Sequence, residues 1–215
     1  FLDILPENYD YINVISGQDF PIKPAAYIYD YLCRSKGKEF MMHDAIDDPG
    51  WNVGPRFRNY HLINWRIPGK HRLEKLVNKL LPARKFPLEG HAIVGRANWF
   101  TVTGRAAAYM MDFLDHHPEV IRYYKYCWGA DEFIWSSMLY NSSFRDSLVD
   151  NLIYVDWPAA HAGHPKMLDA GDFNTLIASD KLFARKMDMD KDSRIFTLLE
   201  EWLSSPDNPY QNVPD

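Results

Sequence analysis

Residues 182–192, with the sequence LFARKMDMDKD, place a basic pair directly before alternating carboxylates. The pair is Arg185 and Lys186, and adjacent cations of this kind suit a phosphate or diphosphate group. The carboxylates have the spacing found at the start of calcium-binding loops: Asp188, Asp190 and Asp192. The segment therefore offers two kinds of chemistry, anion binding in its first half and metal binding in its second.

The acidic half does not complete a metal-binding motif. A calcium loop also needs Gly at its sixth position and Glu at its twelfth. Counted from Asp188, these positions hold Ser193 and Leu199, so the calcium interpretation fails. Residues 188–190 also fit an Asp-x-Asp motif that bridges a metal to a nucleotide diphosphate. That motif usually follows a strand, whereas this one follows a basic pair, so we interpret the last two Asp residues as the polar start of a helix.

Two adjacent acids, Asp131 and Glu132, stand at the start of a helix-like segment at 131–142. The positive end of a helix favours carboxylates, and Asp131 is placed to cap it. In this interpretation both acids only stabilise the start of the helix. In the alternative interpretation one of them is a general base, which must be ionised near neutral pH before it can accept a proton.

Two further polar clusters lie where strands or loops end. Gln18 and Asp19 follow a strand-like run, and ligands bind beyond the carboxyl ends of strands in open α/β sheets. The alternative is a turn in which the Asp bonds its own backbone. His161 and His164 are spaced to share a metal, but no third ligand lies at a diagnostic distance. Lys166, beside them, is a candidate phosphate contact.

The composition is that of a protein with a sizeable core, with 47% hydrophobic and 15% aromatic residues. The formal net charge of -5 argues against a general nucleic-acid binder, so an anionic ligand must meet a local basic patch. Two cysteines, Cys33 and Cys127, do not make a disulfide framework. No stretch approaches the roughly 20 apolar residues of a membrane span.

Strand-like and helix-like segments alternate along the chain, which predicts an α/β layered domain. Strands are expected at 9–17, 39–45, 59–67, 97–103 and 151–157. Helices are expected at 23–35, 70–81, 105–117, 131–142, 169–179 and 192–205. Residues 46–58 are rich in Pro, Gly and Asp and are expected to form a loop. We expect one domain over residues 1–205, followed by a tail at 206–215.

Five segments, in this order, resemble the core-2/I-branching glycosyltransferases of family fourteen, which also include the peptide O-xylosyltransferases. The segments are YINVISGQDFPIKP (11–24), GRANWFTVTGRAAAYM (95–110), ADEFIWSSML (130–139), NLIYVDW (151–157) and AGDFNTLIASDKLFARKMD (170–188). The resemblance implies a GT-A-like α/β fold, a mixed sheet flanked by helices. The family's first βα unit, which holds the uridine, normally precedes YINVISG, so we expect an N-terminal nucleotide-binding part to be missing from this sequence.

The resemblance implies an inverting, metal-independent transfer of a sugar, most simply GlcNAc, from a UDP-sugar to a glycan hydroxyl. Glu132 matches the family's general base in its DE-aromatic-x-W motif, with Asp131 as support. Lys186 matches the diphosphate-binding Lys, and Arg185 precedes it as in the xylosyltransferases. These cations would stabilise the UDP leaving group as a metal would, so no cofactor and no metal are expected.

Further site residues also follow from the resemblance. The family's second diphosphate-binding Arg falls at Gly163, a departure for which Lys166 or Arg185 could substitute. Arg58 and Tyr60, in RFRNYHL, loosely match the acceptor-binding stretch, and the indole of VDW is a stacking surface for the acceptor. The full set of candidates for donor or acceptor binding is Gln18, Asp19, Arg58, Tyr60, Trp99, Asp131 and Trp157.

The expected partners are a UDP-sugar donor and a glycan or glycoconjugate acceptor, with no nucleic acid. The many cysteines of the animal Golgi relatives are missing, which indicates a bacterial relative that acts on a cell-surface glycan. Such an enzyme would lie in the cytoplasm or peripherally at the inner face of the membrane. The alternatives are a peptide O-xylosyltransferase activity, a non-catalytic carbohydrate-binding relative, and a metal-dependent hydrolase that uses the histidines and the acidic run.

Overall fold

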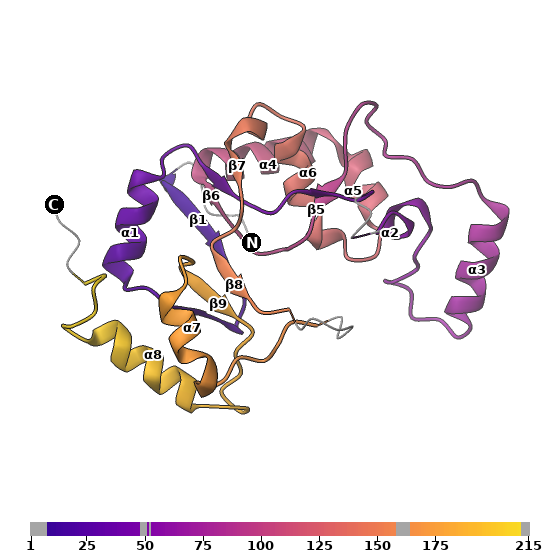
Figure 1. Ribbon diagram of the computed structural model, residues 1–215. Coiled ribbons are helices and arrows are strands. Elements are labelled where there is room, and N and C mark those ends of the chain that lie inside the picture. The colour runs from indigo at the N-terminus through magenta and orange to yellow at the C-terminus, as the bar shows by residue number, and fades with distance from the viewer. Residues whose placement is uncertain (1–7, 48–50, 52, 158–163, 212–215) are drawn as a thin grey trace. The chain divides into compact units, whose positions relative to one another are not determined.

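The structure, a computed structural model, describes residues 8–47, 51, 53–157 and 164–211 (Figure 1). The chain divides into two compact units, each made from two stretches of sequence. Unit 1 comprises residues 1–12 and 38–150, and unit 2 comprises residues 13–37 and 151–215. Each unit has its own buried hydrophobic cluster and is described by itself.

The larger sheet has four strands in the order β1-β6-β3-β7. Strand β3 pairs antiparallel with β6, with Phe40 opposite Thr101, and parallel with β7. The four strands are β1 (Tyr11–Val14), β6 (Phe100–Thr103), β3 (Glu39–Phe40) and β7 (Leu148–Val149). A separate antiparallel pair joins β4 (Asp44–Ala45) to β5 (Val94–Gly95).

Pro opens two of the helices of unit 1, at Pro55 and Pro118. Thr103 caps the helix that follows it, since its hydroxyl accepts from Ala106 N–H at 3.1 Å. Thr103 is itself held by the buried Glu39 carboxylate, which accepts from its N–H and its hydroxyl at 2.7 Å each. The helices are α2 (Pro55–Arg58), α3 (Lys70–Leu80), α4 (Gly104–His116), α5 (Pro118–Tyr124) and α6 (Ile134–Tyr140).

Phe133 lies at the centre of the core of unit 1 and is fully buried. Its ring stacks on Trp51, with the ring centroids 5.2 Å apart, and meets Phe57 edge-on, with the centroids 4.5 Å apart. Tyr124 and Val120, from α5, complete the same cluster. Because Phe133 directly follows Glu132, its packing fixes the backbone that carries this carboxylate.

Unit 2 has a three-stranded sheet in the order β2-β9-β8. Strand β2 pairs antiparallel with β9, which places Asp19 opposite Arg185, and β8 pairs parallel with β9. The strands are β2 (Asp19–Pro21), β9 (Phe183–Arg185) and β8 (Ile153–Val155). The helices are α1 (Ala25–Arg34), α7 (Phe173–Ala178) and α8 (Arg194–Ser204).

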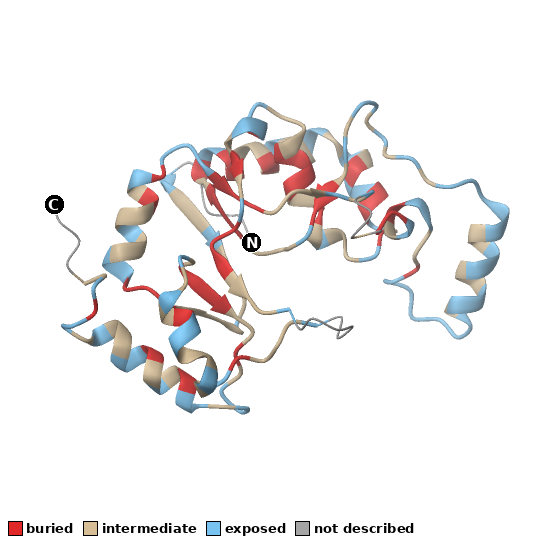
Figure 2. Ribbon diagram, in the orientation of Figure 1, coloured by how far each residue is buried: buried red, intermediate tan, exposed pale blue. Residues whose placement is uncertain are grey.

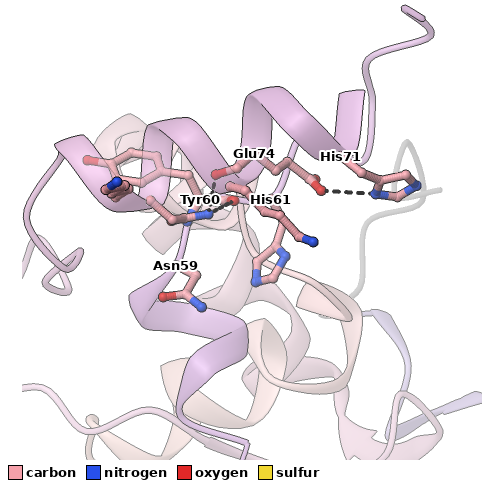
Figure 3. Close-up of a pocket in the computed structure, with 8 residues that line it drawn as sticks. Asn59, Tyr60, His61, His71 and Glu74 are labelled. Atoms are coloured by element: carbon pink, nitrogen blue, oxygen red, sulfur yellow. Dashed lines mark hydrogen bonds and ion pairs between the residues drawn. The ribbon is translucent and has the colours of Figure 1, made fainter. Parts of the chain in front are cut away.

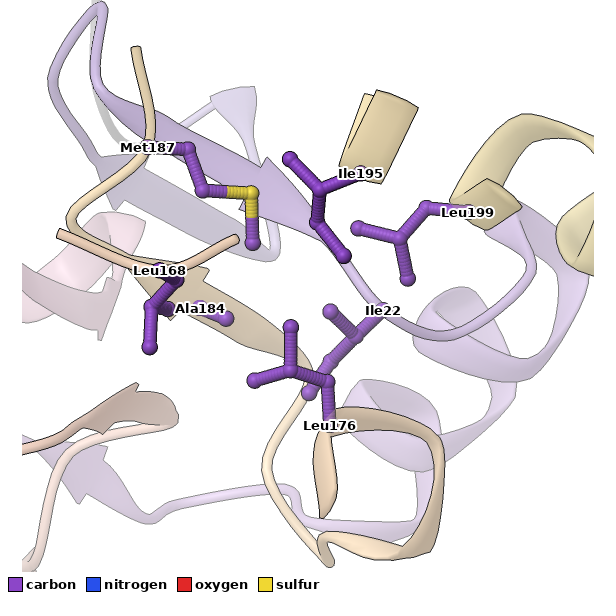
Figure 4. Packing of buried hydrophobic residues seen from close by; sticks show 7 residues of the cluster. All are labelled: Ile22, Leu168, Leu176, Ala184, Met187, Ile195 and Leu199. Carbon is purple, nitrogen blue, oxygen red and sulfur yellow. The ribbon is translucent and has the colours of Figure 1, made fainter. Parts of the chain in front are cut away.

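The core of unit 2 is formed where α7 and α8 pack on this sheet (Figure 4). Its members are Ile22, Leu168, Leu176, Ala184, Met187, Ile195 and Leu199. Tyr210 packs edge-on against Tyr27 at 4.7 Å, and its ring lies 4.3 Å from the ammonium of the buried Lys23. The residues around Tyr210, expected to be a tail, therefore pack on unit 2.

Most of the expected elements are confirmed, and the mixture of strands and helices confirms the α/β class. The strand expected at 59–67 is wrong. Two of its backbone N–H groups are bonded to side chains instead of a neighbouring strand: Tyr60 donates to Asn78 and Leu62 to Glu74. The loop expected at 46–58 is wrong in its last residues, which form α2. Four short strands and α5 were not anticipated.

Candidate active site

Glu132 ends a 3-10 turn, Ala130–Glu132, and helix α6 begins two residues later. The turn is held against β5, since Arg96 N–H donates to the Glu132 carbonyl at 3.2 Å. Gly95 lies so close that a Cβ there would meet the same carbonyl oxygen and would lie 2.6 Å from the Phe133 ring. The short loop of GRANWF and the turn that carries Glu132 therefore fit together only because residue 95 has no side chain.

The Glu132 carboxylate forms an ion pair with Arg56, with Oε2 2.8 Å from Nη1. The Arg56 guanidinium lies 4.1 Å from the centre of the Trp128 ring, so it is clamped between an acid and an aromatic face. Burial raises the pKa of Glu132 above its usual value, and Arg56 opposes this effect only in part. The side chain remains 35% exposed, so the structure holds a carboxylate that is more basic than usual and still reachable.

Asp131 does not cap a helix, and the expected capping role is wrong. Phe133 precedes α6, and no side chain caps that helix. Asp131 instead accepts from the Asn98 amide at 2.9 Å. Trp99, the next residue in that loop, is half-buried beside β6. Asp131 thus ties the Glu132 turn to a second loop of unit 1, which fits the supporting role expected from the resemblance.

Arg58 and Tyr60 lie at the end of α2 and just beyond it. Arg58 pairs with Asp47 at 2.6 Å, and both side chains are exposed. Tyr60 lines an open cavity of about 430 Å³ between residues 59–61 and α3 (Figure 3). Figure 3 shows the Glu74 side chain reaching toward His71 along one wall of this cavity. The cavity has polar walls, and Glu132 is not among the residues that line it.

Arg185 forms the buried ion pair of unit 2. Its Nε lies 3.4 Å from Asp19 Oδ1, and the Asp19 and Arg185 side chains are 0% and 14% exposed. Burial lowers the pKa of Arg185 from its usual value, and the Asp19 carboxylate opposes this. The other Asp19 oxygen accepts from Ser16 N–H, so the predicted turn that binds its own backbone is present.

Lys186 differs from Arg185 in having a free side chain. Its backbone is fixed, because its carbonyl accepts from Leu168 N–H at 2.8 Å. The next N–H, of Met187, donates to the Gln18 carbonyl at 2.9 Å. Its ammonium has no hydrogen bond or ion pair with any residue that the structure describes. Within unit 2, Lys186 is thus a cation on a rigid backbone that remains available to an anion.

Lys166 and Trp157 lie near the end of β8. The Lys166 ammonium pairs with Asp172 at 2.6 Å, and this hydrogen bond raises the pKa of Lys166. Asp172 belongs to a capping box with Asp169 at the start of the 3-10 turn before α7, so Lys166 already has a structural partner. Trp157 is largely exposed. The departure at Gly163 and the first of the two histidines lie outside the described residues.

The acidic half of the 182–192 segment is tied into local turns. Asp190 N–H donates to Asp188 Oδ1 at 3.0 Å. Asp192 accepts from Ala170 N–H and from Arg194, and this bonding lowers its pKa to about 2. Asp192 therefore joins the start of α8 to the turn before α7, as a polar start of the last helix should. In the described part of the chain, no three His, Cys, Asp or Glu residues group as metal ligands would.

Arg56 is the site residue that the sequence interpretation missed. It lies two positions before Arg58, in the same RFR motif, and its partner Glu132 is 76 residues away. The sequence offered no signal for this pair beyond the two arginines of the RFR motif. No helix in the described residues is long and apolar enough to cross a membrane.

In the comparison with protein families, residues 2–177 match the model described as Core-2/I-Branching enzyme. This range includes Gly95, Asp131 and Glu132 and ends before Arg185. A search of curated proteins found no match. Since the family model covers most of the sequence, the resemblance to this family is confirmed; the matched range contains the first four segments and only residues 170–177 of the fifth. The chain belongs to the core-2/I-branching enzyme family, whose members are glycosyltransferases that join a donor sugar to a glycan acceptor.

Proposed function

We propose that this enzyme transfers GlcNAc from UDP-GlcNAc to a hydroxyl of a glycan with inversion at the anomeric carbon, on a GT-A-like fold. The observation that carries the proposal is the state of Glu132. Its carboxylate is half-buried, its pKa is raised by burial, and Arg56 and the Gly95 backbone hold it in place. A general base needs this combination of basicity, access and fixed geometry.

In this mechanism Glu132 accepts the proton of the acceptor hydroxyl as the hydroxyl oxygen attacks C1 of the donor sugar. The new bond forms on the face opposite the departing UDP, and the electron pair of the broken bond goes to the β-phosphate oxygen. A base placed at the attacked face is worth about a hundredfold or more in rate. Asp131, which is bonded to Asn98, supports the turn that positions this base.

Lys186 is the residue that we assign to the leaving diphosphate. Charge builds on the β-phosphate as the glycosidic bond breaks, and a cation positioned in advance stabilises it without reorganisation. The free Lys186 ammonium and its fixed backbone suit this role. Arg185 supports it through the buried pair with Asp19, which fixes the end of β9 directly before Lys186. This proposal requires no metal ion, since the cation supplies the charge.

The acceptor-binding candidates rest on exposure and on the resemblance. Trp157 offers a largely exposed indole, a surface on which sugar rings stack. Arg58 and Tyr60 line or adjoin the cavity beside α3. Trp99 and Gln18 stay as candidates for donor or acceptor contact. A xylosyl donor is the second candidate, because a basic residue precedes Lys186 as it does in the xylosyltransferases.

The test is a donor screen with the full-length protein, in which UDP-GlcNAc, UDP-xylose, UDP-galactose and UDP-glucose are offered with glycan acceptors. We expect UDP release to be fastest with UDP-GlcNAc and the product linkage, read by NMR, to be β, the inverted configuration. A product that keeps the α configuration of the donor would overturn the proposal. Faster turnover of UDP-xylose would replace the donor and keep the mechanism.

A further inference from the structure

Residues 61–85 form a segment of unit 1 that we name the basic arm. Of the 24 Lys and Arg residues in the chain, seven lie in the basic arm, against one of the 29 Asp and Glu residues. The basic arm therefore carries a net charge of +6 within a chain whose net charge is -5. Such a local reversal of sign marks a surface for an anionic partner.

Helix α3 has one face turned to the protein and one to solvent. Asn78 and Glu74 bind the backbone of Tyr60 and Leu62, at 2.6 and 2.7 Å, and these bonds define the inner face. The outer face is exposed, as the pale blue of α3 in Figure 2 shows. Apart from His71, its exposed residues are a basic stripe beside an apolar pair: Arg72, Lys75 and Lys79, with Leu76 and Leu80. The two leucines are four residues apart and so are neighbours on the helix.

The loop that leads into α3 is also apolar and exposed. Ile63, Trp65 and Ile67 alternate with polar residues there, and Trp65 is 43% exposed. On the helix, Leu80 reaches 70% exposure, and Leu81 continues the same exposed run. A soluble surface usually shows single apolar side chains, whereas a cluster of large ones marks a binding surface. Exposed Trp, Ile and Leu beside Lys and Arg is the pattern of an element that lies in a membrane interface.

We propose that the basic arm binds the surface of a membrane that contains anionic lipids. Arg66, Arg72, Lys75 and Lys79 would contact headgroup phosphates, while the exposed apolar side chains of the loop and of α3 enter the boundary between headgroups and acyl chains. The arm would lie in the interface and would not span it, since α3 has only 11 residues.

Charge and exposure together favour a lipid surface over a soluble polyanion. A soluble polyanion would bind the cations but leave Trp65, Leu76 and Leu80 in water. It would therefore explain the basic side chains of the arm and not the exposed apolar ones. A bilayer interface explains both. This inference does not depend on the sugar transfer proposed above, because neither Glu132 nor Lys186 belongs to the arm. Lys75 and Lys79 also line the cavity beside Tyr60.

The test is flotation of the full-length protein with vesicles of phosphatidylcholine, with and without phosphatidylglycerol. We expect binding only to vesicles with phosphatidylglycerol, and weaker binding at high salt. The triple variant Arg72→Gln/Lys75→Gln/Lys79→Gln should lower the affinity at least about tenfold, since each cation near an anionic surface contributes. The matched control removes the same charge elsewhere: Lys36→Gln/Lys125→Gln/Lys191→Gln, all exposed and outside the arm, should bind as the wild type does.

The variant Leu76→Ser/Leu80→Ser separates the lipid from a soluble polyanion. It should lose affinity for the vesicles severalfold and keep its affinity for dextran sulfate, because only the lipid uses the leucines. Circular dichroism of each variant shows whether α3 remains folded. The proposal is overturned if the wild type does not bind phosphatidylglycerol vesicles, if the control triple loses as much affinity as the arm triple, or if the leucine variant floats as well as the wild type.

Discussion

Two arginine–carboxylate pairs, one in each unit, differ in how much water reaches them. In unit 1, the Glu132 and Arg56 side chains are 35% and 23% exposed, and their oxygen and nitrogen lie 2.8 Å apart. In unit 2, the Asp19 side chain is fully buried, and its contact with Arg185 is longer, at 3.4 Å. The first pair leaves a carboxylate that can exchange a proton with a substrate. The second is buried inside unit 2 and holds the end of β9 in place.

The difference shows how one ion-pair chemistry serves two purposes. A reachable pair with a raised carboxylate pKa suits proton transfer. A buried pair is costly to break, because removal of one partner leaves a buried charge without compensation. Lys186 directly follows Arg185 in the sequence. The buried pair therefore fixes the backbone next to this candidate functional residue.

The largest effect on stability should come from the buried pair. We expect Asp19→Ala to lower the free energy of unfolding by about 3–5 kcal/mol, since it removes a buried carboxylate that pairs with Arg185. Urea denaturation followed by circular dichroism measures this change. Asp47→Ala is the matched control, because it breaks the exposed pair with Arg58 and should have little effect. Equal losses for both variants would show that the Asp19 pair is not buried as described.

The next largest effect should come from Gly95, which packs against the turn that carries Glu132. Gly95→Ala places a Cβ against the Glu132 carbonyl and the Phe133 ring, and the backbone there cannot move aside. We expect a loss of about 1–3 kcal/mol in stability, together with a lower turnover. Gly17→Ala serves as the control, since a Cβ at Gly17 meets nothing within 4 Å. A Gly95→Ala protein with normal stability and activity would contradict the close fit of β5 and the Glu132 turn.

A smaller effect, on UDP affinity, is expected from substitution of Lys186, the residue after the buried pair. Lys186→Ala should weaken UDP binding by about tenfold, because one charge-assisted contact is lost. Lys166→Ala should change UDP affinity little, since that ammonium is already paired with Asp172. Isothermal titration with UDP compares the two variants. If Lys166→Ala weakened UDP binding more than Lys186→Ala, the roles of the two lysines would have to be exchanged.

The smallest effect is a shift of a pH profile. Glu132 must be ionised to act as a base, so kcat/KM rises as pH increases through its pKa. Arg56 lowers that pKa, so Arg56→Ala should move the acidic limb of the profile to higher pH. Arg58→Ala, whose guanidinium pairs with Asp47, should leave the limb where it is. An unchanged limb in Arg56→Ala would show that the ion pair does not act on the base.

The sequence anticipated the parts of the structure that depend on local patterns. The helices at 70–81 and 105–117 have strong periodicity and were predicted to within a residue or two. The strand expected at 59–67 was wrong, because its alternation serves contacts with α3. Strands β2 and β9 have only three residues each, too few for a pattern, and so the pairing of Asp19 with Arg185 could not be predicted.

The residues of the candidate site also divide into those that a local motif predicts and those that depend on tertiary contacts. Glu132 was proposed from its motif, which is a property of the sequence. Arg56 and Gly95 were not found, because their roles come from contacts with a turn that follows many residues later. The expected capping by Asp131 failed because the 3-10 turn and Phe133 stand between it and α6. Tertiary contacts therefore decide which acid of the motif is available.

The most direct test of the central claim is the turnover of Glu132→Gln in the full-length protein. Gln keeps the shape of the side chain and removes its ability to accept a proton, so kcat should fall at least about a hundredfold while UDP affinity stays near that of the wild type. Glu89→Gln, an exposed change elsewhere in unit 1, should keep full activity. A Glu132→Gln enzyme that turns over at the wild-type rate would contradict the assignment of Glu132 as the base.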